Sequence, residues 1–265
     1  MNYRLIALDV DGTLLNDDHE LTPRVGQAVR EAAERGAEIV ICTGRGSTSA
    51  LGVLRELGLR GTMITHNGAS VVDSETREVI HDTAITHERA RRYMDFLRER
   101  GIHYDLNTAF DLFVEEMNEE AAAMYGNLLA KPIKTSFAES LPERLVKMSI
   151  YAPKPVLDEV ESEWQSWAHE LQTIRSGDYF IDVQHPNASK GQALQWLAEQ
   201  RGIPRECILA MGNYYNDMEM LAYAGWGVAM ENSPDEVKAA ADEVTVSNNE
   251  DGVAVVLERL AIARA

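Results

Sequence analysis

The chain has 265 residues and a mass of 29.5 kDa, which is enough for one large domain or two modest ones. Hydrophobic residues make up 45% and charged residues 26%, as in ordinary globular proteins. The formal net charge of −18 argues against nonspecific binding to nucleic acid or to anionic membranes, because the field of the protein repels phosphate polymers. We therefore expect no nucleic-acid or membrane partner, and a small anionic substrate would need local cations.

The start of the chain and its cysteines bear on where the protein acts. The first apolar run is short and is interrupted by aspartates, which predicts neither a signal peptide nor a membrane span. No apolar run approaches the roughly 20 residues that cross a bilayer. Cys42 and Cys207 follow apolar residues in strand-like runs, so we expect reduced core residues rather than a disulfide. A cytoplasmic protein is the expectation.

The first part of the chain alternates between short apolar runs and segments with helical spacing. Thr22-Pro23 is typical of a helix start, and Gly36 of a helix end. Asn67-Gly68 favours a tight turn between two paired strands. The predicted elements are strands at 5–8, 38–42, 62–65 and 69–72 and helices at 22–35 and 47–57. Strands and helices that alternate with short connections predict a parallel sheet with helices on both faces.

After about residue 84 the pattern changes to that of an α+β module. A charged amphipathic helix is predicted at 86–100, and a long helix at 156–171 contains Trp164 and Trp167. The other predicted elements of this module are strands at 102–106, 111–116 and 146–151, a helix at 119–129, and a hairpin formed by 173–175 and 179–183.

The last part of the chain returns to the α/β pattern. It has predicted helices at 189–200, at 217–222 and from 234, and predicted strands at 207–211, 227–230 and 244–246. The predicted fold class is therefore α/β. A Rossmann-like parallel-sheet core of residues 1–83 and 186–265 is interrupted by an inserted α+β domain at 84–185.

Two aspartates follow the first predicted strand, at a place where open parallel sheets bind ligands. One residue, Val10, separates Asp9 from Asp11, and Gly12-Thr13 allows the chain to turn away from the strand. Neighbouring carboxylates repel unless a cation stabilises them, and a hard dication such as Mg²⁺ suits such oxygens. An acidic turn that caps the strand explains the same residues about equally well.

Polar residues also follow the second strand and begin a later helix. Thr43-Gly44-Arg45 places a hydroxyl and main-chain N–H groups before a helix, which suits an anion. Taken alone, a helix cap with a surface arginine is the simpler interpretation. Lys190 lies at a helix start, where a cation is unfavourable unless its ammonium group meets an anion. A surface lysine is the alternative.

The fourth polar segment follows the predicted strand that ends at residue 211. Gly212 turns the chain, while Asn213, Asn216 and Asp217 offer oxygens that suit a metal or a phosphate group. An Asn-rich turn that caps the next helix is the favoured interpretation when this segment is considered alone.

Each of the four segments is a weak or moderate indication of function when it is considered alone. All four in this order are specific for one family. They resemble the four motifs of the haloacid dehalogenase superfamily, and most of all its Cof-type phosphatases with a large type IIB (C2) cap domain between the second and third motifs. The matching residues are Asp9-Val10-Asp11-Gly12-Thr13, Thr43-Gly44-Arg45, Lys190 and Gly212-Asn213-x-x-Asn216-Asp217. The segment His66-Asn67-Gly68-Ala69 is similar to an Asn-Gly-Ala turn of the same family.

The resemblance implies Mg²⁺-dependent hydrolysis of a small phosphorylated metabolite, such as a sugar phosphate or a phosphorylated cofactor. Asp9 would be the nucleophile that forms an aspartyl-phosphate, and Asp11 the general acid and then the base. The residues implied in binding substrate or phosphate are Val10, Thr43, Gly44, Arg45, Lys190 and Asn216. Those implied at the metal are Asp9, Asp11 through its main chain, Asn213, and Asp217 in a supporting role. The inserted domain would close over the site as a cap and select the leaving group.

Position 213 departs from the pattern, because the family usually has aspartate there. An amide oxygen still binds Mg²⁺ but brings no charge, so we expect a lower metal affinity. Two other functions stay open at this point: a phosphomutase or phosphotransferase on the same scaffold, and a phosphometabolite-binding protein with little turnover. A monomer and a homodimer are both compatible with the sequence.

Overall fold

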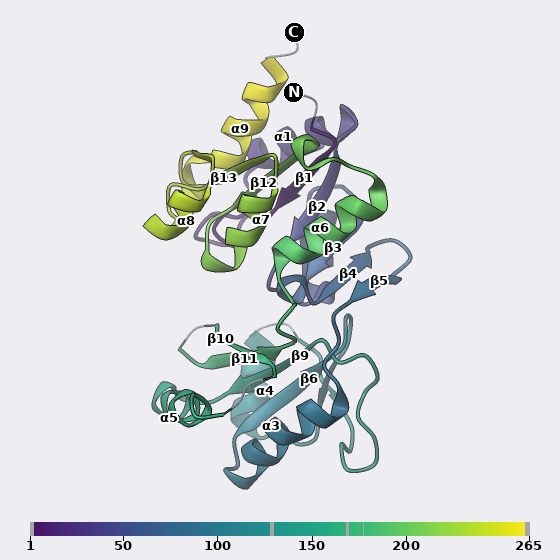
Figure 1. Ribbon diagram of the computed structural model, residues 1–265, viewed down its shortest axis with the longest axis vertical. Coiled ribbons are helices and arrows are strands. Elements are labelled where there is room, and N and C mark those ends of the chain that lie inside the picture. Colours follow the sequence, from purple (N-terminus) through teal and green to yellow (C-terminus); the bar gives the residue numbers. More distant parts are fainter. Residues whose placement is uncertain (1–2, 128–129, 168–169, 177, 263–265) are drawn as a thin grey trace. The chain divides into compact units, whose positions relative to one another are not determined.

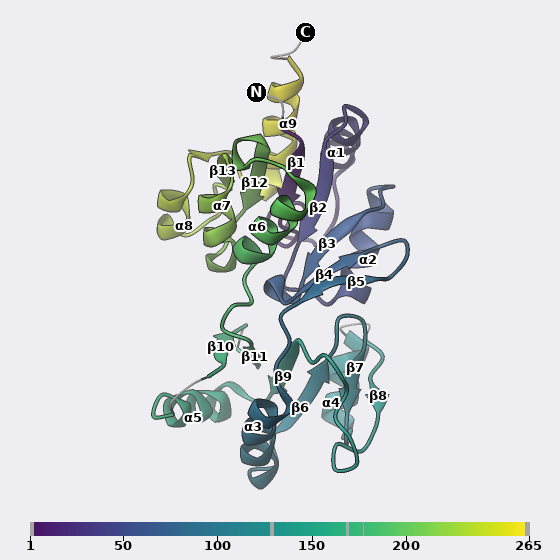
Figure 2. The same cartoon turned by 45° about the vertical axis from the view of Figure 1, so that its right-hand side comes forward.

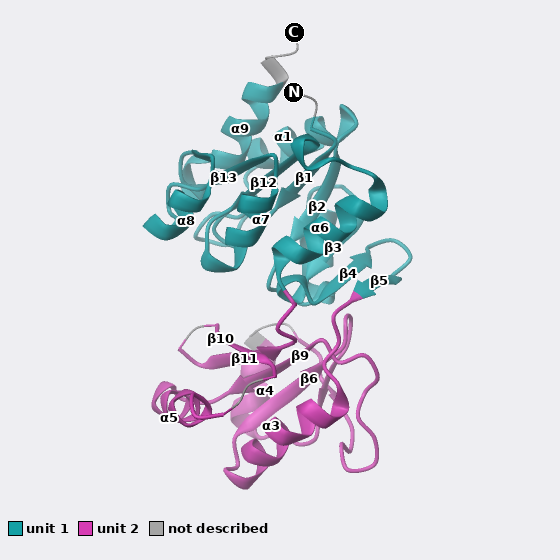
Figure 3. Ribbon diagram, viewed as in Figure 1, with its two compact units in different colours: residues 1–81, 189–265 teal, residues 82–188 magenta. Residues whose placement is uncertain are grey.

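The computed structural model describes residues 3–127, 130–167, 170–176 and 178–262. The chain divides into two compact units (Figure 3), of which unit 1 comprises residues 1–81 and 189–265 and unit 2 comprises residues 82–188. The boundaries expected from the sequence lie at 83/84 and 185/186, next to the places where the chain passes from one unit to the other.

Unit 1 is built on an eight-stranded sheet with the order β14-β13-β12-β1-β2-β3-β4-β5. Its strands are β1 (Leu5–Leu8), β2 (Glu38–Cys42), β3 (Thr62–Thr65), β4 (Ser70–Asp73), β5 (Val79–Asp82), β12 (Ile208–Gly212), β13 (Trp226–Ala229) and β14 (Glu243–Val244). The strands from β14 to β3 are parallel, and β4 runs antiparallel beside β3, as the predicted hairpin requires. The predicted α/β class is confirmed.

Helices cover both faces of this sheet (Figures 1 and 2). They are α1 (Pro23–Glu34), α2 (Ser47–Glu56), α6 (Lys190–Arg201), α7 (Met218–Tyr223), α8 (Asp235–Ala240) and α9 (Gly252–Ile262). Helices α1 and α9 pack together on one face, and α6 and α7 pack together on the other, over Leu5 and Ala7 of β1. The Thr22 side chain caps α1 by accepting a hydrogen bond from the Val25 N–H, as the Thr22-Pro23 pair predicts.

The order of the strands brings the ends of β1 and β12 together. After β1 the chain builds β2 and β3 on one side, and after β12 it builds β13 and β14 on the other. Leu8 pairs with Met211 of β12 and with Ile41 of β2, so residues that follow these three strands leave the sheet side by side. Ligands of open α/β sheets bind at such a reversal of strand order, beyond the carboxyl ends of the strands.

Unit 2 contains a six-stranded sheet with the order β10-β11-β9-β6-β7-β8. Its elements are α3 (His87–Glu99), β6 (His103–Asn107), β7 (Leu112–Val114), α4 (Glu119–Asn127), β8 (Ile133–Lys134), β9 (Lys147–Tyr151), α5 (Lys154–Trp164), β10 (Gln172–Arg175) and β11 (Phe180–Gln184). Apolar residues of β6, β9 and β11 pack with α3 and α5 in one core. The mixture of helices with a mainly antiparallel sheet is the predicted α+β arrangement.

Several elements differ from the expectations. The helix predicted at 156–171 is wrong in length, because α5 starts at Lys154 and ends at Trp164; residues 168–169 of the predicted helix lie outside the described residues. After Trp164 the chain tightens, with the Trp167 N–H donating to the Trp164 carbonyl, and the Trp167 ring packs against Tyr93 and Phe96 of α3. The spacing of apolar residues along the sequence did not predict β5, the exposed two-residue strand β8, or α9.

The structure shows the state of both cysteines and the extent of the helices. Cys42 and Cys207 are both free thiols, with Cys42 buried and Cys207 partly exposed. Within the described parts of the chain, every helix is too short or too polar to cross a bilayer.

The second face of the unit 2 sheet carries buried polar side chains, including Asp105 and Asn107 of β6. One Asp105 oxygen accepts a hydrogen bond from the Tyr125 hydroxyl at 2.9 Å, and the other accepts one from the Asn107 amide at 2.6 Å. Burial raises the pKa of Asp105 to about 6, because water no longer stabilises the carboxylate, although Lys147 partly opposes this.

We predict that Asp105 makes unit 2 less stable as the pH rises from about 4 to about 6. Unfolded Asp105 ionises near its usual pKa of about 3.9, whereas folded Asp105 holds its proton up to a pKa of about 6. The folded state therefore binds more protons in this window, and its stability falls as the pH rises.

Asp105→Asn is neutral at every pH and should remove this contribution, which amounts to roughly 3 kcal/mol across the window. Urea unfolding of both proteins at a series of pH values measures the difference. Parallel pH profiles for the two proteins would contradict the prediction.

Candidate active site

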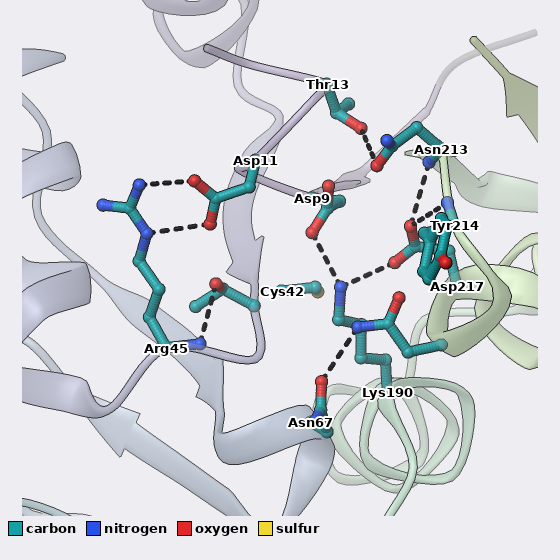
Figure 4. A network of polar contacts seen from close by, with 12 residues as sticks. Asp9, Asp11, Thr13, Cys42, Arg45, Asn67, Lys190, Asn213, Tyr214 and Asp217 are labelled. Carbon is teal, nitrogen blue, oxygen red and sulfur yellow. Dashed lines mark hydrogen bonds and ion pairs between the residues drawn. The ribbon is translucent and has the colours of Figure 1, made fainter. Parts of the chain in front are cut away.

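A buried lysine connects two aspartates at the carboxyl end of the sheet (Figure 4). Asp9 follows β1, Lys190 is the first residue of α6, and Asp217 ends a short helical turn after β12. The Lys190 Nζ lies 2.7 Å from Asp9 Oδ1 and 2.6 Å from Asp217 Oδ1. The exposed fractions are 1% for Lys190, 4% for Asp9 and 0% for Asp217. Charges this deeply buried are stable only when paired, which explains a lysine at the unfavourable end of a helix.

Burial and the paired charges act in opposite directions on these groups. Burial raises the pKa of Asp9 to about 7, and the nearby Asp217 carboxylate adds to this effect. Lys190 and a main-chain hydrogen bond from Val10 oppose the rise. Burial would lower the pKa of Lys190, but the attraction of Asp217 and Asp9 outweighs burial and raises it. Lys190 therefore stays charged, and any further cation next to Asp9 would favour its carboxylate form.

Asp217 also shapes the loop that follows β12. Its Oδ2 accepts hydrogen bonds from the main-chain N–H groups of Asn213 and Tyr214, at 2.9 and 3.0 Å. Both oxygens of Asp217 are thus engaged, one with Lys190 and one with the loop. The carboxylate holds the lysine and positions Asn213 opposite β1.

The Asn213 amide faces the two aspartates of the first motif. In the orientation drawn in Figure 4, its oxygen accepts a hydrogen bond from Thr13 Oγ1 at 3.3 Å. With the amide turned over, its nitrogen donates to the Asp11 main-chain carbonyl at 2.9 Å, to Asp9 Oδ2 at 3.1 Å and to Thr13 Oγ1 at 3.3 Å. Gly12 makes room for this side chain: its φ is +77°, and a Cβ there would lie 2.3 Å from the Asn213 amide nitrogen as drawn.

Asp11 forms a two-pronged ion pair with Arg45. Arg45 Nε donates to Asp11 Oδ2 at 2.8 Å, and its terminal nitrogen donates to Oδ1 at 2.5 Å. The hydrogen bonds to Asp11 raise the pKa of Arg45. Such a fork fixes the orientation of a carboxylate. The sequence predicts a substrate contact for Arg45, and the structure places its guanidinium group on Asp11.

A second polar group forms where β2 and β3 end. Thr43 Oγ1 accepts a hydrogen bond from the Arg45 N–H at 3.1 Å, and Asn67 Oδ1 accepts one from Asn216 Nδ2 at 2.9 Å. Asn67 lies in a left-handed turn in which its φ is +54° and that of Gly68 is +93°. A Cβ at Gly68 would lie 2.0 Å from the main-chain oxygen of Ser189, so this turn packs directly on the start of α6.

The structure therefore collects most of the expected residues in two sets. Asp9, Asp11, Lys190, Asn213 and Asp217 lie around the ends of β1 and β12, and Arg45 reaches them through Asp11. The second set, Thr43, Gly44 and Asn216, lies around Asn67. The hydrogen bonds made by Thr13 and Asn67 could not be predicted from the sequence, because both depend on the tertiary fold. The Asn67-Gly68 pair indicated only a turn.

The oxygens around Asp9 suit a divalent cation. Asp9 Oδ2, the Asp11 main-chain carbonyl and the Asn213 amide oxygen are hard donors, of which one is charged. The amide atom that faces β1 lies 2.9 Å from the Asp11 oxygen and 3.1 Å from Asp9 Oδ2. Neighbouring oxygens around an octahedral Mg²⁺ are about 3 Å apart. In the described residues no three His, Cys, Asp or Glu side chains form a metal cluster, so the fit depends on neutral oxygens.

Comparison with known proteins identifies the family of this chain. The model of the haloacid dehalogenase-like hydrolase family matches residues 6–257. The chain belongs to this family. It is 31% identical to the phosphatase YwpJ of Bacillus subtilis, over 97% of this chain and 99% of the relative.

Two further matches extend over nearly the whole hydrolase. The B. subtilis 5-amino-6-(5-phospho-D-ribitylamino)uracil phosphatase YcsE is 31% identical, over 96% of this chain and 94% of the relative. A solved haloacid dehalogenase-like hydrolase from Bacteroides thetaiotaomicron superposes with a TM-score of 0.88 at 28% identity, covering 98% of this chain and 100% of that one. These matches identify the chain as an enzyme of this family, a phosphatase.

We predict that Lys190→Met destabilises this hydrolase by about 3–5 kcal/mol, because Asp9 and Asp217 then remain buried without their cation. Urea unfolding measures the loss. The matched control is Lys238→Met in the same unit, where the lysine lies 3.9 Å from the mostly exposed Glu231. That change should cost less than about 1 kcal/mol. Equal losses for the two variants would contradict the assigned role of Lys190.

Proposed function

We propose that this phosphatase hydrolyses a small phosphorylated metabolite with the help of Mg²⁺ and through an aspartyl-phosphate at Asp9. The observation that carries the proposal is the environment of Asp9. One of its oxygens is fixed by a buried lysine, and the other lies beside the Asn213 amide, which also reaches the Asp11 carbonyl. A carboxylate held in this way at the carboxyl end of a parallel sheet suits a nucleophile that attacks phosphorus.

The reaction would proceed in two steps. Asp9 attacks the phosphorus, the bond to the ester oxygen breaks, and Asp11 gives its proton to the leaving oxygen. Asp11 then takes a proton from a water molecule, which attacks the phosphorus, so that phosphate leaves and Asp9 is regenerated. Arg45 donates to both Asp11 oxygens in the structure, so one of these hydrogen bonds would open when Asp11 carries the proton, and the other would keep Asp11 oriented.

The remaining residues of the site would bind the phosphoryl oxygens and the metal. Donors for the oxygens are the Lys190 ammonium, the Thr43 hydroxyl, the main-chain N–H groups of Val10 and Gly44, and the Asn216 amide. A divalent cation held by Asp9, the Asp11 carbonyl and Asn213 would offset the repulsion between the carboxylate and the phosphate dianion. Asp217 would support Lys190 and the loop that carries Asn213.

We propose that unit 2 selects the leaving group. The resemblance to the family implies this role for the cap domain. The relative YcsE is named for 5-amino-6-(5-phospho-D-ribitylamino)uracil. We therefore propose a first substrate panel of this compound, sugar phosphates, pyridoxal phosphate and flavin mononucleotide. Comparison of kcat/KM across the panel would define the substrate class.

We predict that Asp9→Asn lowers Mg²⁺-dependent phosphate release from a generic aryl phosphate by at least about 1000-fold, because an amide does not form the acyl phosphate. The exposed Asp235→Asn on the first turn of α8 is the matched control and should keep full activity. Equal activity of Asp9→Asn and the unmodified enzyme would contradict the assignment of Asp9. Release of inorganic phosphate in equal amount to the alcohol separates hydrolysis from phosphomutase or phosphotransferase activity.

A further inference from the structure

Asn213 has contacts that suggest more than a weak metal ligand. We infer that its amide takes the place of the divalent cation while no cation is bound, and that the amide turns over when the cation binds. This inference rests on the proposed metal-dependent function and concerns how this chain keeps its site ready for the metal.

The first argument is hydrogen bonding. With its nitrogen toward β1, the Asn213 amide donates to the Asp11 carbonyl at 2.9 Å and to Asp9 Oδ2 at 3.1 Å, which are ordinary hydrogen-bond lengths. With its oxygen in that position, three acceptor oxygens would face one another, and only the Thr13 hydroxyl would be left to donate, at 3.3 Å. Without a cation, the orientation with the nitrogen toward β1 is therefore the stable one.

The second argument is charge. Lys190 neutralises one of the two buried carboxylates of Asp9 and Asp217, and it approaches Asp9 only at Oδ1. Asp9 Oδ2 is the oxygen that lacks this contact, and the Asn213 amide lies beside it. An aspartate at 213 would place a third carboxylate there, which would repel Asp9 until a cation arrived. The amide removes that repulsion and adds a donor.

The third argument is that the amide can turn without any movement of the backbone. The main-chain N–H of Asn213 is held by Asp217 Oδ2, and the missing side chain of Gly12 leaves space beside the amide. The last torsion of asparagine is broad and roughly two-fold, so rotation by half a turn exchanges nitrogen and oxygen at almost the same positions. The same 2.9 and 3.1 Å separations then suit neighbouring ligands of one Mg²⁺.

Cation binding must therefore replace hydrogen bonds that already exist, and the protein supplies little negative charge to drive it. The phosphate dianion of a substrate brings the missing charge. Mg²⁺ should accordingly bind weakly to the free protein and more tightly in the presence of phosphate.

The experiment compares the full-length protein with Asn213→Asp by thermal unfolding in EDTA and in excess Mg²⁺. In EDTA, Asn213→Asp should melt at least about 5 °C below the unmodified protein, and Mg²⁺ should restore most of this loss. The unmodified protein should gain less than about 2 °C from Mg²⁺. An Asn213→Asp protein that melts in EDTA at or above the unmodified protein, or equal gains from Mg²⁺ in both, would overturn the inference.

Gln195→Glu is the control for the chemical change itself. On the exposed side of α6, the Gln195 amide donates to the Glu199 carboxylate at 2.9 Å, so this substitution also replaces an amide–carboxylate hydrogen bond by a like-charge pair. Because the pair is exposed, the melting temperature of this variant should fall by less than about 2 °C, and its gain from Mg²⁺ should equal that of the unmodified protein. If Asn213→Asp does not fold in EDTA, Asn213→Ala replaces it: a lower melting temperature than the unmodified protein supports the amide contacts, and an unchanged one refutes them.

Calorimetric titration with Mg²⁺, with and without inorganic phosphate, tests the affinity. Asn213→Asp should bind Mg²⁺ about tenfold more tightly or better, and phosphate should strengthen binding more in the unmodified protein. Equal affinities would contradict the inference. None of these measurements needs turnover, so a failure of the phosphatase mechanism would appear in the Asp9→Asn assay and leave the melting comparison intact.

Discussion

The ammonium group of Lys190, buried between Asp9 and Asp217, is the interaction on which the rest of the site depends. It joins the end of β1, the start of α6 and the loop after β12 through two short ion pairs. Loss of Lys190 would leave both carboxylates buried without a compensating charge, which is strongly destabilising. The three segments are therefore held in one arrangement, and Asp9 keeps a fixed position with one oxygen available for chemistry.

This arrangement follows from the order of the strands in unit 1. The strands that follow β1 lie on one side of it, and those that follow β12 lie on the other side, so β1 and β12 are neighbours in the sheet. Thr13 and Asn213, which are 200 positions apart in the sequence, therefore lie side by side beyond the ends of these strands. The polar contacts at this edge of the sheet have different roles. Asp217 accepts hydrogen bonds from the loop after β12, Arg45 orients the Asp11 carboxylate, and Asn67 accepts a hydrogen bond from Asn216. Position 213 departs from the pattern that the resemblance implies, and there the amide connects the loop back to Asp9 and Asp11.

Sequence patterns predicted most of this fold, because strand runs, the Thr22 cap and the Asn67-Gly68 turn are local signals. They predicted the wrong end for α5, because Trp164 and Trp167 have a helical spacing although the chain tightens between them. The convergence of the site residues could be inferred from parallel strands that end together. The Arg45–Asp11 fork and the Asn213 contacts could not, since they depend on side-chain torsions that the fold determines. The assigned catalytic and metal roles stay predictions.

The central claim is that Lys190 holds Asp9 as the group that receives the phosphoryl from the substrate. It is tested most directly by acid quenching of the enzyme during turnover, followed by mass-spectrometric mapping of the phosphorylated residue. The account predicts a base-labile phosphoryl group on Asp9 that disappears once the substrate is consumed. Phosphorylation at any other residue, or turnover with no phosphoenzyme detected at any quench time, would contradict it.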